Sequence, residues 1–218
     1  MKIKERGLAL FALLLTVALL IGCKGNTNEA NAMASDAKAK IGEEAPAFKL
    51  KDVVNGKEIS LADYKGKIVV MTFQSINCPW DRYREEGGYQ RVLNKLADEY
   101  KDKDVQFIAI NSNSDETVDQ VKVYAEKSGV PYPILKDPGN VVADEYGGAT
   151  TPHFFVIDKE GKLVYMGGVE QAPNTPEECG QMEEQYLVPV LNALIAGEKL
   201  PYEVTKSKGC TIKREGTS

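Results

Sequence analysis

Two almost uninterrupted apolar segments constrain the fold of this chain more than any other feature. They span residues 67–73 and 105–110 and are rich in branched aliphatic residues and phenylalanine. Strands that are apolar on both faces occur in parallel sheets whose two sides are covered by helices. Segments with helical spacing of apolar residues follow them, at 79–100 and 115–128, and Gly129 is suited to end the second. This alternation predicts an α/β fold.

The second half of the sequence predicts the rest of a three-layer sandwich. Residues 153–157 and 163–167 have the composition of strands, and the turn at 158–162 joins them in a hairpin. Because a hairpin adds antiparallel pairing to parallel strands, the central sheet is expected to be mixed. The other expected elements are an edge strand near Phe48, a strand at 133–135, and helices at 141–146 and 182–196.

The first 22 residues have the pattern of an export signal. A basic start with Lys2, Lys4 and Arg6 precedes an uncharged, leucine-rich run over residues 7–22. That run is short for a membrane-spanning helix, which needs about 20 residues. It ends immediately before Cys23, and the junction resembles the signal of bacterial lipoproteins. The resemblance implies cleavage before Cys23 and attachment of lipid to its sulfur; the alternative is an N-terminal membrane helix with an incidental cysteine.

The regions that follow divide the chain into a tether, a domain and a tail. Residues 23–40 are rich in Asn, Ala, Lys and Ser and predict a lipidated, flexible tether. Residues 41–200 are long enough for one domain, and 201–218 form a polar tail that we expect to be mobile and able to fold back. With the lipid anchor, the domain is expected in the cell envelope, outside the cytoplasm and attached to a bacterial membrane.

Charge and histidine content exclude several classes of function. The net charge of −5 and the lack of a basic cluster argue against nucleic acid as a partner. His153 is the single histidine of the chain and stands at the start of a predicted strand, without a second type of metal ligand nearby in the sequence. We therefore expect no metal site and no cofactor.

Three cysteines remain after the candidate lipidation site: Cys78, Cys179 and Cys210. Export places them in an oxidising compartment, where disulfides form and persist. Because three is an odd number, one thiol is free or pairs between molecules whenever the other two are bridged.

Cys78 is the candidate nucleophile. It follows the apolar strand at 67–73, and Pro79 then opens a segment with helical content that is interrupted at Gly87-Gly88. A cysteine at a helix start has its pKa lowered from about 8.5 into the range of roughly 3.5–7.5. Asp81 occupies the position of the second cysteine in a C-x-x-C motif, and its carboxylate would raise that pKa. The alternative is a buried structural cysteine.

Three motifs resemble those of thioredoxin-fold redoxins of the alkyl-hydroperoxide-reductase/thiol-specific-antioxidant class. They are Ile76-Asn77-Cys78-Pro79, Ala109-Ile110-Asn111-Ser112-Asn113 and Gly209-Cys210-Thr211-Ile212-Lys213. The resemblance implies a thioredoxin-like three-layer sandwich and thiol chemistry. The chain departs from the class at Asp81 and Thr150, where relatives often carry cysteines. It also has Met71 where a peroxiredoxin loop has proline, although Ser75 fills the hydroxyl position of that loop.

The resemblance also implies which residues bind substrate. Thr151-Pro152 matches the cis-proline loop that faces the active cysteine and offers backbone groups to an extended substrate. Pro79 and Trp80, next to Cys78, are expected to flank the substrate, with Trp80 partly shielding the sulfur. Cys210 is the candidate resolving cysteine; a static disulfide between Cys179 and Cys210 is the alternative that stays open.

The leading hypothesis is a thiol-disulfide oxidoreductase of the cell envelope that uses Cys78 as nucleophile, resolved by Cys210 or by an outside thiol. Its partners would be a protein dithiol or disulfide, an external thiol reductant and, through the lipid anchor, the membrane. One alternative is a thiol peroxidase in which Cys78 reduces hydroperoxides. A further alternative is a non-catalytic redoxin-fold module that binds extended peptide.

Overall fold

The computed structural model describes residues 37–82 and 87–216 of the 218-residue chain. The predicted signal peptide, the lipidation site Cys23 and most of the predicted tether lie outside these ranges. Within them, no helix combines the length and the apolar character needed to cross a membrane.

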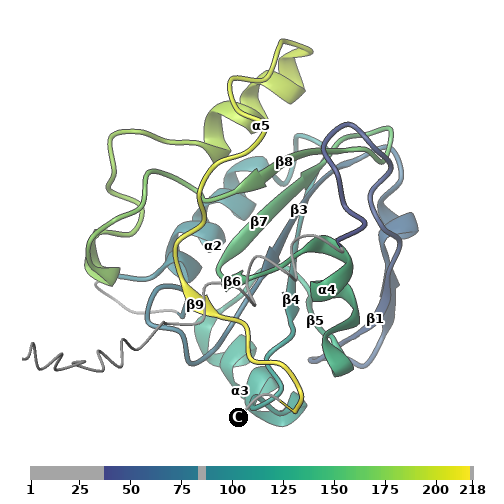
Figure 1. Cartoon of the computed structure of the whole chain (residues 1–218), viewed down its shortest axis with the longest axis vertical. Coiled ribbons are helices and arrows are strands. Elements are labelled where there is room, and N and C mark those ends of the chain that lie inside the picture. Colours follow the sequence, from purple (N-terminus) through teal and green to yellow (C-terminus); the bar gives the residue numbers. More distant parts are fainter. Residues whose placement is uncertain (1–36, 83–86, 217–218) are drawn as a thin grey trace, which may run out of the picture.

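The described ranges contain one seven-stranded mixed sheet, with the strand order β2-β1-β5-β4-β3-β7-β8 (Figure 1). Parallel pairing joins the central strands β3, β4 and β5, whereas β7 and β8 pair antiparallel beyond β3, and β1 and β2 do so at the other edge. The bounds are β1 (Lys49–Asp52), β2 (Glu58–Ser60), β3 (Ile68–Phe73), β4 (Val105–Asn111), β5 (Ile134–Lys136), β7 (His153–Ile157) and β8 (Leu163–Gly167). The predicted mixed sheet is confirmed.

Helices cover both faces of the sheet, because its central strands are apolar on both sides. Successive residues of β3 alternate, so that Val70 belongs to one core and Met71 to the other. The first core is covered by α2 (Tyr89–Tyr100), α3 (Val118–Ser128) and α5 (Leu187–Ala196), and the second by α4 (Val141–Tyr146). Short 3₁₀ turns are η1 (Leu61–Tyr64), η2 (Pro138–Asn140) and η3 (Pro176–Glu178). This is the predicted thioredoxin-like three-layer sandwich.

The segment at 79–100, expected to be interrupted at Gly87-Gly88, forms the regular helix α2 from Tyr89 onward. Residues 79–82 form a turn, in which the N–H groups of Asp81 and Arg82 donate to the Cys78 carbonyl. Gly88 precedes α2 with φ +80°, and a Cβ there would lie 2.1 Å from the Arg82 carbonyl oxygen. The interruption expected at Gly87-Gly88 is therefore present, and α2 lies beyond it.

Two other helices begin later than expected. Thr117 caps α3 by accepting the Gln120 N–H, so this helix starts at Val118. The closing helix starts at Leu187 instead of residue 182, because the buried Glu170 carboxylate accepts the Met182 N–H and the Gln185 side-chain amide. These contacts hold the segment before α5 against the body of the domain.

The tail and the end of the predicted tether both pack on the domain. The short strand β9 (Cys210–Thr211) pairs with β6 (Thr150–Thr151), and the yellow tail in Figure 1 runs past β6 toward the loop before α3. Ile212 is only 2% exposed and belongs to the second core, which holds down a tail that its polar composition predicted to be mobile. Ala39 is buried in the same core, so the packed domain begins before residue 41.

Candidate active site

The Cys78 sulfur lies against the Thr151-Pro152 loop. Cys78 is 2% exposed, and its Sγ–H donates to the Thr151 carbonyl oxygen at 2.9 Å. The Thr151-Pro152 peptide bond is cis, as predicted, and both of these residues are buried. The loop that the sequence placed opposite the candidate nucleophile therefore contacts it directly.

Ser75 and Glu116 hold the segment that delivers Cys78. The Ser75 Oγ accepts the Cys78 N–H at 3.1 Å and the Asn77 N–H at 3.2 Å, and it donates to Glu116 Oε1 at 2.6 Å. Glu116 is 1% exposed and also accepts the N–H groups of Ile76 and Asn77. The hydroxyl of Ser75 is thus committed to the backbone of its own loop and to Glu116.

Sequence reasoning missed Glu116, because no local pattern marks it. It follows the Asn111–Asn113 motif on the loop before α3, and the Asn111 side-chain amide donates to its carboxylate. Lys136 on β5 donates to Asn111 Oδ1 and to the carbonyl oxygens of Asn113 and Glu116, each at 2.7 Å. Burial lowers the pKa of Lys136, while Glu116 and Asp137 oppose this effect.

Asp81 is buried beneath the same loop. Its Oδ2 accepts the Ser75 N–H at 2.6 Å, whereas its Oδ1 is buried without a hydrogen-bond partner in the described ranges. Burial raises the pKa of Asp81 well above its ordinary value, the Ser75 N–H opposes this, and Glu116 adds to the rise.

The structure reverses the predicted direction of the Cys78 pKa. Burial, the contact with the Cys210 side chain and the charge of Asp81 together raise the pKa of Cys78 to about 12. In the described residues Cys78 is followed by the turn at 79–82, and α2 begins at Tyr89. Of the predicted effects on the pKa of Cys78, only that of Asp81 has the expected direction, because its charge raises this pKa.

Cys210 lies next to Cys78, and Cys179 does not share this site. In the β6–β9 pair, Cys210 is the direct partner of Thr151, whose Oγ1 donates to the Cys210 carbonyl oxygen. The neighbours of the fully buried Cys179 are the Trp80 carbonyl oxygen, Tyr89 and Glu170. All three thiols are free, so the static Cys179–Cys210 disulfide that the sequence left open is not formed.

Of the other residues singled out by the sequence, Pro79 and Trp80 lie next to Cys78, whereas His153 lies after the cis-proline. Pro79 and Trp80 are half-buried beside Cys78, and the Lys208 ammonium of the tail lies 4.7 Å from the centre of the Trp80 ring.

His153 lies beyond the cis-proline with its ring centre 4.5 Å from that of Phe155, and burial lowers the pKa of His153 to about 4. In the part of the chain described here, no cluster of three or more His, Cys, Asp or Glu side chains could hold a metal ion.

Known proteins resemble this chain in sequence and in structure. Residues 41–166 match the model of the AhpC/TSA family. The thiol-disulfide oxidoreductase ResA of Bacillus thuringiensis (strain Al Hakam) is 37% identical over 147 residues, which cover 67% of this chain and 80% of that protein.

Two solved structures extend the comparison. An uncharacterized conserved protein from Geobacillus kaustophilus superposes with a TM-score of 0.72 and 31% identity, covering 82% of this chain and 94% of the other. The thioredoxin domain of a thiol-disulfide oxidoreductase from Bacteroides vulgatus gives a TM-score of 0.50 and 28% identity, covering 58% and 87%. The motifs around Cys78, the cis-proline loop and these matches agree, and the chain belongs to the AhpC/TSA family of thioredoxin-fold redoxins.

Proposed function

We propose that this chain is a thiol-disulfide oxidoreductase of the cell envelope, with Cys78 as the nucleophile and Cys210 as the resolving thiol. The observation that carries the proposal is the pairing of Cys210 with Thr151, whose carbonyl oxygen accepts the Cys78 thiol. Two thiols thus meet at the cis-proline loop, although they are far apart in the sequence. The thiol-disulfide oxidoreductases among the similar proteins support the same reaction class.

The reaction follows from this arrangement. The Cys78 thiolate attacks one sulfur of a substrate disulfide, whose bond breaks, and the departing substrate thiolate takes up a proton. The Cys210 thiolate then attacks the Cys78 sulfur of the mixed disulfide and releases the second substrate thiol. Two electrons have passed from the two cysteines to the substrate, and an external dithiol restores them by reducing the Cys78–Cys210 disulfide.

Anchoring at the membrane is part of the proposal. Cleavage before Cys23 and lipidation of its sulfur would hold the domain close to membrane-bound partners outside the cytoplasm. The protein dithiols or disulfides of the envelope, together with a thiol reductant, are then the partners within reach.

Mass spectrometry of the full-length protein tests the roles of the thiols. The reduced protein is treated briefly with insulin, as a disulfide substrate, or with hydrogen peroxide, and the products are separated without reductant. The Cys210→Ser variant is expected to accumulate a mixed disulfide between Cys78 and an insulin chain, and the parent a Cys78–Cys210 disulfide. Cys179→Ser is the matched control and should behave like the parent.

Other outcomes would favour the alternatives. Rapid sulfenic acid at Cys78 with peroxide, without any mixed disulfide from insulin, would identify a thiol peroxidase. An unmodified Cys78 under both treatments would leave a binding module. If a Cys78→Ser variant still formed the mixed disulfide, the nucleophile would be another cysteine.

A further inference from the structure

Strand β9 occupies the edge of the cis-proline loop as an added strand would. Thr150 pairs with Thr211 and Thr151 with Cys210 in antiparallel register, and the Ile212 N–H donates to the Ala149 carbonyl oxygen at 3.1 Å. Extended peptides bind to other proteins by this kind of strand addition, with the backbone giving affinity and the side chains selectivity. The tail is thus placed like a bound polypeptide whose cysteine lies over Cys78.

The backbone at this edge leaves room only for glycine at the position immediately before the cysteine. A Cβ on Gly209 would lie 2.0 Å from the Thr151 carbonyl oxygen and 2.5 Å from the Thr151 carbonyl carbon. Real Cβ atoms do not come this close to other atoms, and the atoms in the way are backbone of the loop that contacts Cys78. The requirement is steric, and it applies to any strand that lies in the position of β9.

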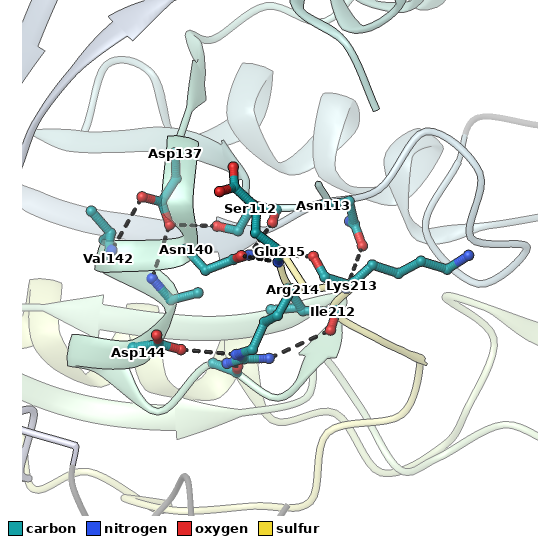
Figure 2. A network of polar contacts seen from close by, with 12 residues as sticks. Ser112, Asn113, Asp137, Asn140, Val142, Asp144, Ile212, Lys213, Arg214 and Glu215 are labelled. Atoms are coloured by element: carbon teal, nitrogen blue, oxygen red, sulfur yellow. Dashed lines mark hydrogen bonds and ion pairs between the residues drawn. The ribbon is translucent and has the colours of Figure 1, made fainter. Parts of the chain in front are cut away.

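A polar network fastens the tail beyond Cys210 (Figure 2). The Lys213 N–H donates to Asn113 Oδ1 at 2.9 Å, and the Arg214 side chain donates to Asp144 Oδ1 and to the Gly148 carbonyl oxygen, both at 2.8 Å. Next to this network, Ile212 is inserted into the second core. With the tail in place Cys78 is 2% exposed, so an outside polypeptide reaches its sulfur only after β9 has left.

We propose that the edge formed by Cys78 and Thr150–Thr151 binds the protein substrate as an extended strand with glycine immediately before its cysteine. Strand β9 occupies this edge in the free protein, and the substrate strand displaces it. The inference rests on the proposed function, because it assigns the substrate of the same Cys78. The tail and the substrate strand compete for the same edge of β6. Weakening the polar network that fastens the tail should therefore favour binding of the substrate strand.

Peptides with the tail sequence test the selection of glycine. A peptide of residues 207–213 is prepared with its cysteine joined to 5-thio-2-nitrobenzoate, in a native form and with alanine in place of the glycine. In full-length Cys210→Ser protein, Cys78 attacks the peptide sulfur and loses its proton to solvent. The Cys78–peptide disulfide forms, and coloured thionitrobenzoate leaves. We expect the glycine peptide to react at least about tenfold faster than the alanine peptide.

A second variant tests the displacement of β9. Adding Arg214→Ala to Cys210→Ser should accelerate the glycine peptide several-fold, whereas adding Lys199→Ala, at an exposed position after α5, should not. Cys78→Ser protein supplies the background rate.

The controls separate this inference from the proposed function. Equal rates for the two peptides would overturn the selection of glycine, and an unchanged rate in the Arg214→Ala protein would overturn the competition, provided that the small disulfide 5,5′-dithiobis(2-nitrobenzoate) still reacts at Cys78. If that small disulfide also fails to react at Cys78, the proposed function fails instead.

Discussion

Cys78, the proposed nucleophile, is kept protonated by its surroundings. With a pKa raised to about 12, only on the order of one thiol in 10⁵ is ionised at pH 7. Burial is the largest cause, and the contact with Cys210, which lies on the docked tail, is the second. Opening of the site is therefore expected to lower the pKa of Cys78.

The alkylation of Cys78 should show this protonation directly. Its rate with iodoacetamide, followed by peptide mass spectrometry, is expected to rise about tenfold per pH unit from pH 7 to pH 10 without levelling off. A free cysteine peptide, with a pKa of about 8.5, levels off near pH 9 and is the control. A plateau for Cys78 below pH 9 would contradict the assigned pKa.

Asp81 makes the stability of the fold depend on pH. Because burial raises its folded-state pKa above the ordinary value of 3.8, its stabilising effect is complete below pH 3.8 and is lost as pH rises through the folded-state pKa. Asp81→Asn removes this loss, so the variant should be more stable than the parent at pH 8, and the difference should shrink toward pH 4.

Urea unfolding of both proteins between pH 4 and pH 8 measures this difference. Asp98→Asn, at an exposed residue of α2, is a matched control without the trend. A constant difference between Asp81→Asn and the parent at all pH values would show that Asp81 does not titrate differently in the folded state.

At the scale of elements, the loop between β3 and α2 is shaped by the loop before α3. The Glu116 carboxylate accepts three donors from residues 75–77 and a fourth from Asn111. A buried carboxylate that is fully hydrogen-bonded replaces the secondary structure that the Cys78 loop lacks. The redoxin motif at 111–113 thus supports the Cys78 loop through Glu116.

Glu116→Gln should weaken this support. A glutamine has one acceptor oxygen and an NH₂ group that would face backbone donors, so the free energy of unfolding is expected to fall by about 2–3 kcal/mol. Urea unfolding measures the change, with Glu126→Gln on the exposed face of α3 as the control. A loss as small as that of the control would mean that Ser75 alone orders the loop.

At the scale of the whole molecule, the two ends of the described chain close the same side of the sandwich. Ala39 and Ile212 both enter the second core, next to α4, and immediately before Ile212 the tail passes beside Cys78 as β9. Stability and access to the thiol are therefore coupled, since the side chain that docks the tail also belongs to the core.

Ile212→Ala should open the site. Loss of a buried isoleucine side chain costs roughly 2–5 kcal/mol, and the tail can leave without unfolding the sheet. We expect hydrogen exchange to accelerate at the Ile212 amide and iodoacetamide to label Cys78 at least about tenfold faster. Ile195→Ala, at a 41% exposed position of α5, is the control. Destabilisation of the whole fold with unchanged labelling of Cys78 would argue against the tail as a cover.

The sequence by itself determined the layers of this protein and most of their elements. Apolar periodicity is a local property, so the strands around Val70 and Phe107, the hairpin after His153 and the glycine that ends α3 could be predicted without coordinates. The redoxin motifs likewise indicated Cys78 and the cis-proline loop. Helix starts were less predictable: α3 and α5 begin later than their apolar spacing suggested, because Thr117 caps α3 and contacts with Glu170 hold the segment before α5.

Tertiary structure decided what the site can do. Glu116 contacts Ser75, 41 positions away in the sequence, and Cys210 contacts Thr151, 59 positions away. No local sequence pattern indicates either contact. The direction of the Cys78 pKa also followed from burial and from the contact with Cys210, which lies far away in the sequence. Local periodicity specifies which segments become strands and helices, whereas the chemistry of a thiol depends on the water and charges that folding removes or brings near.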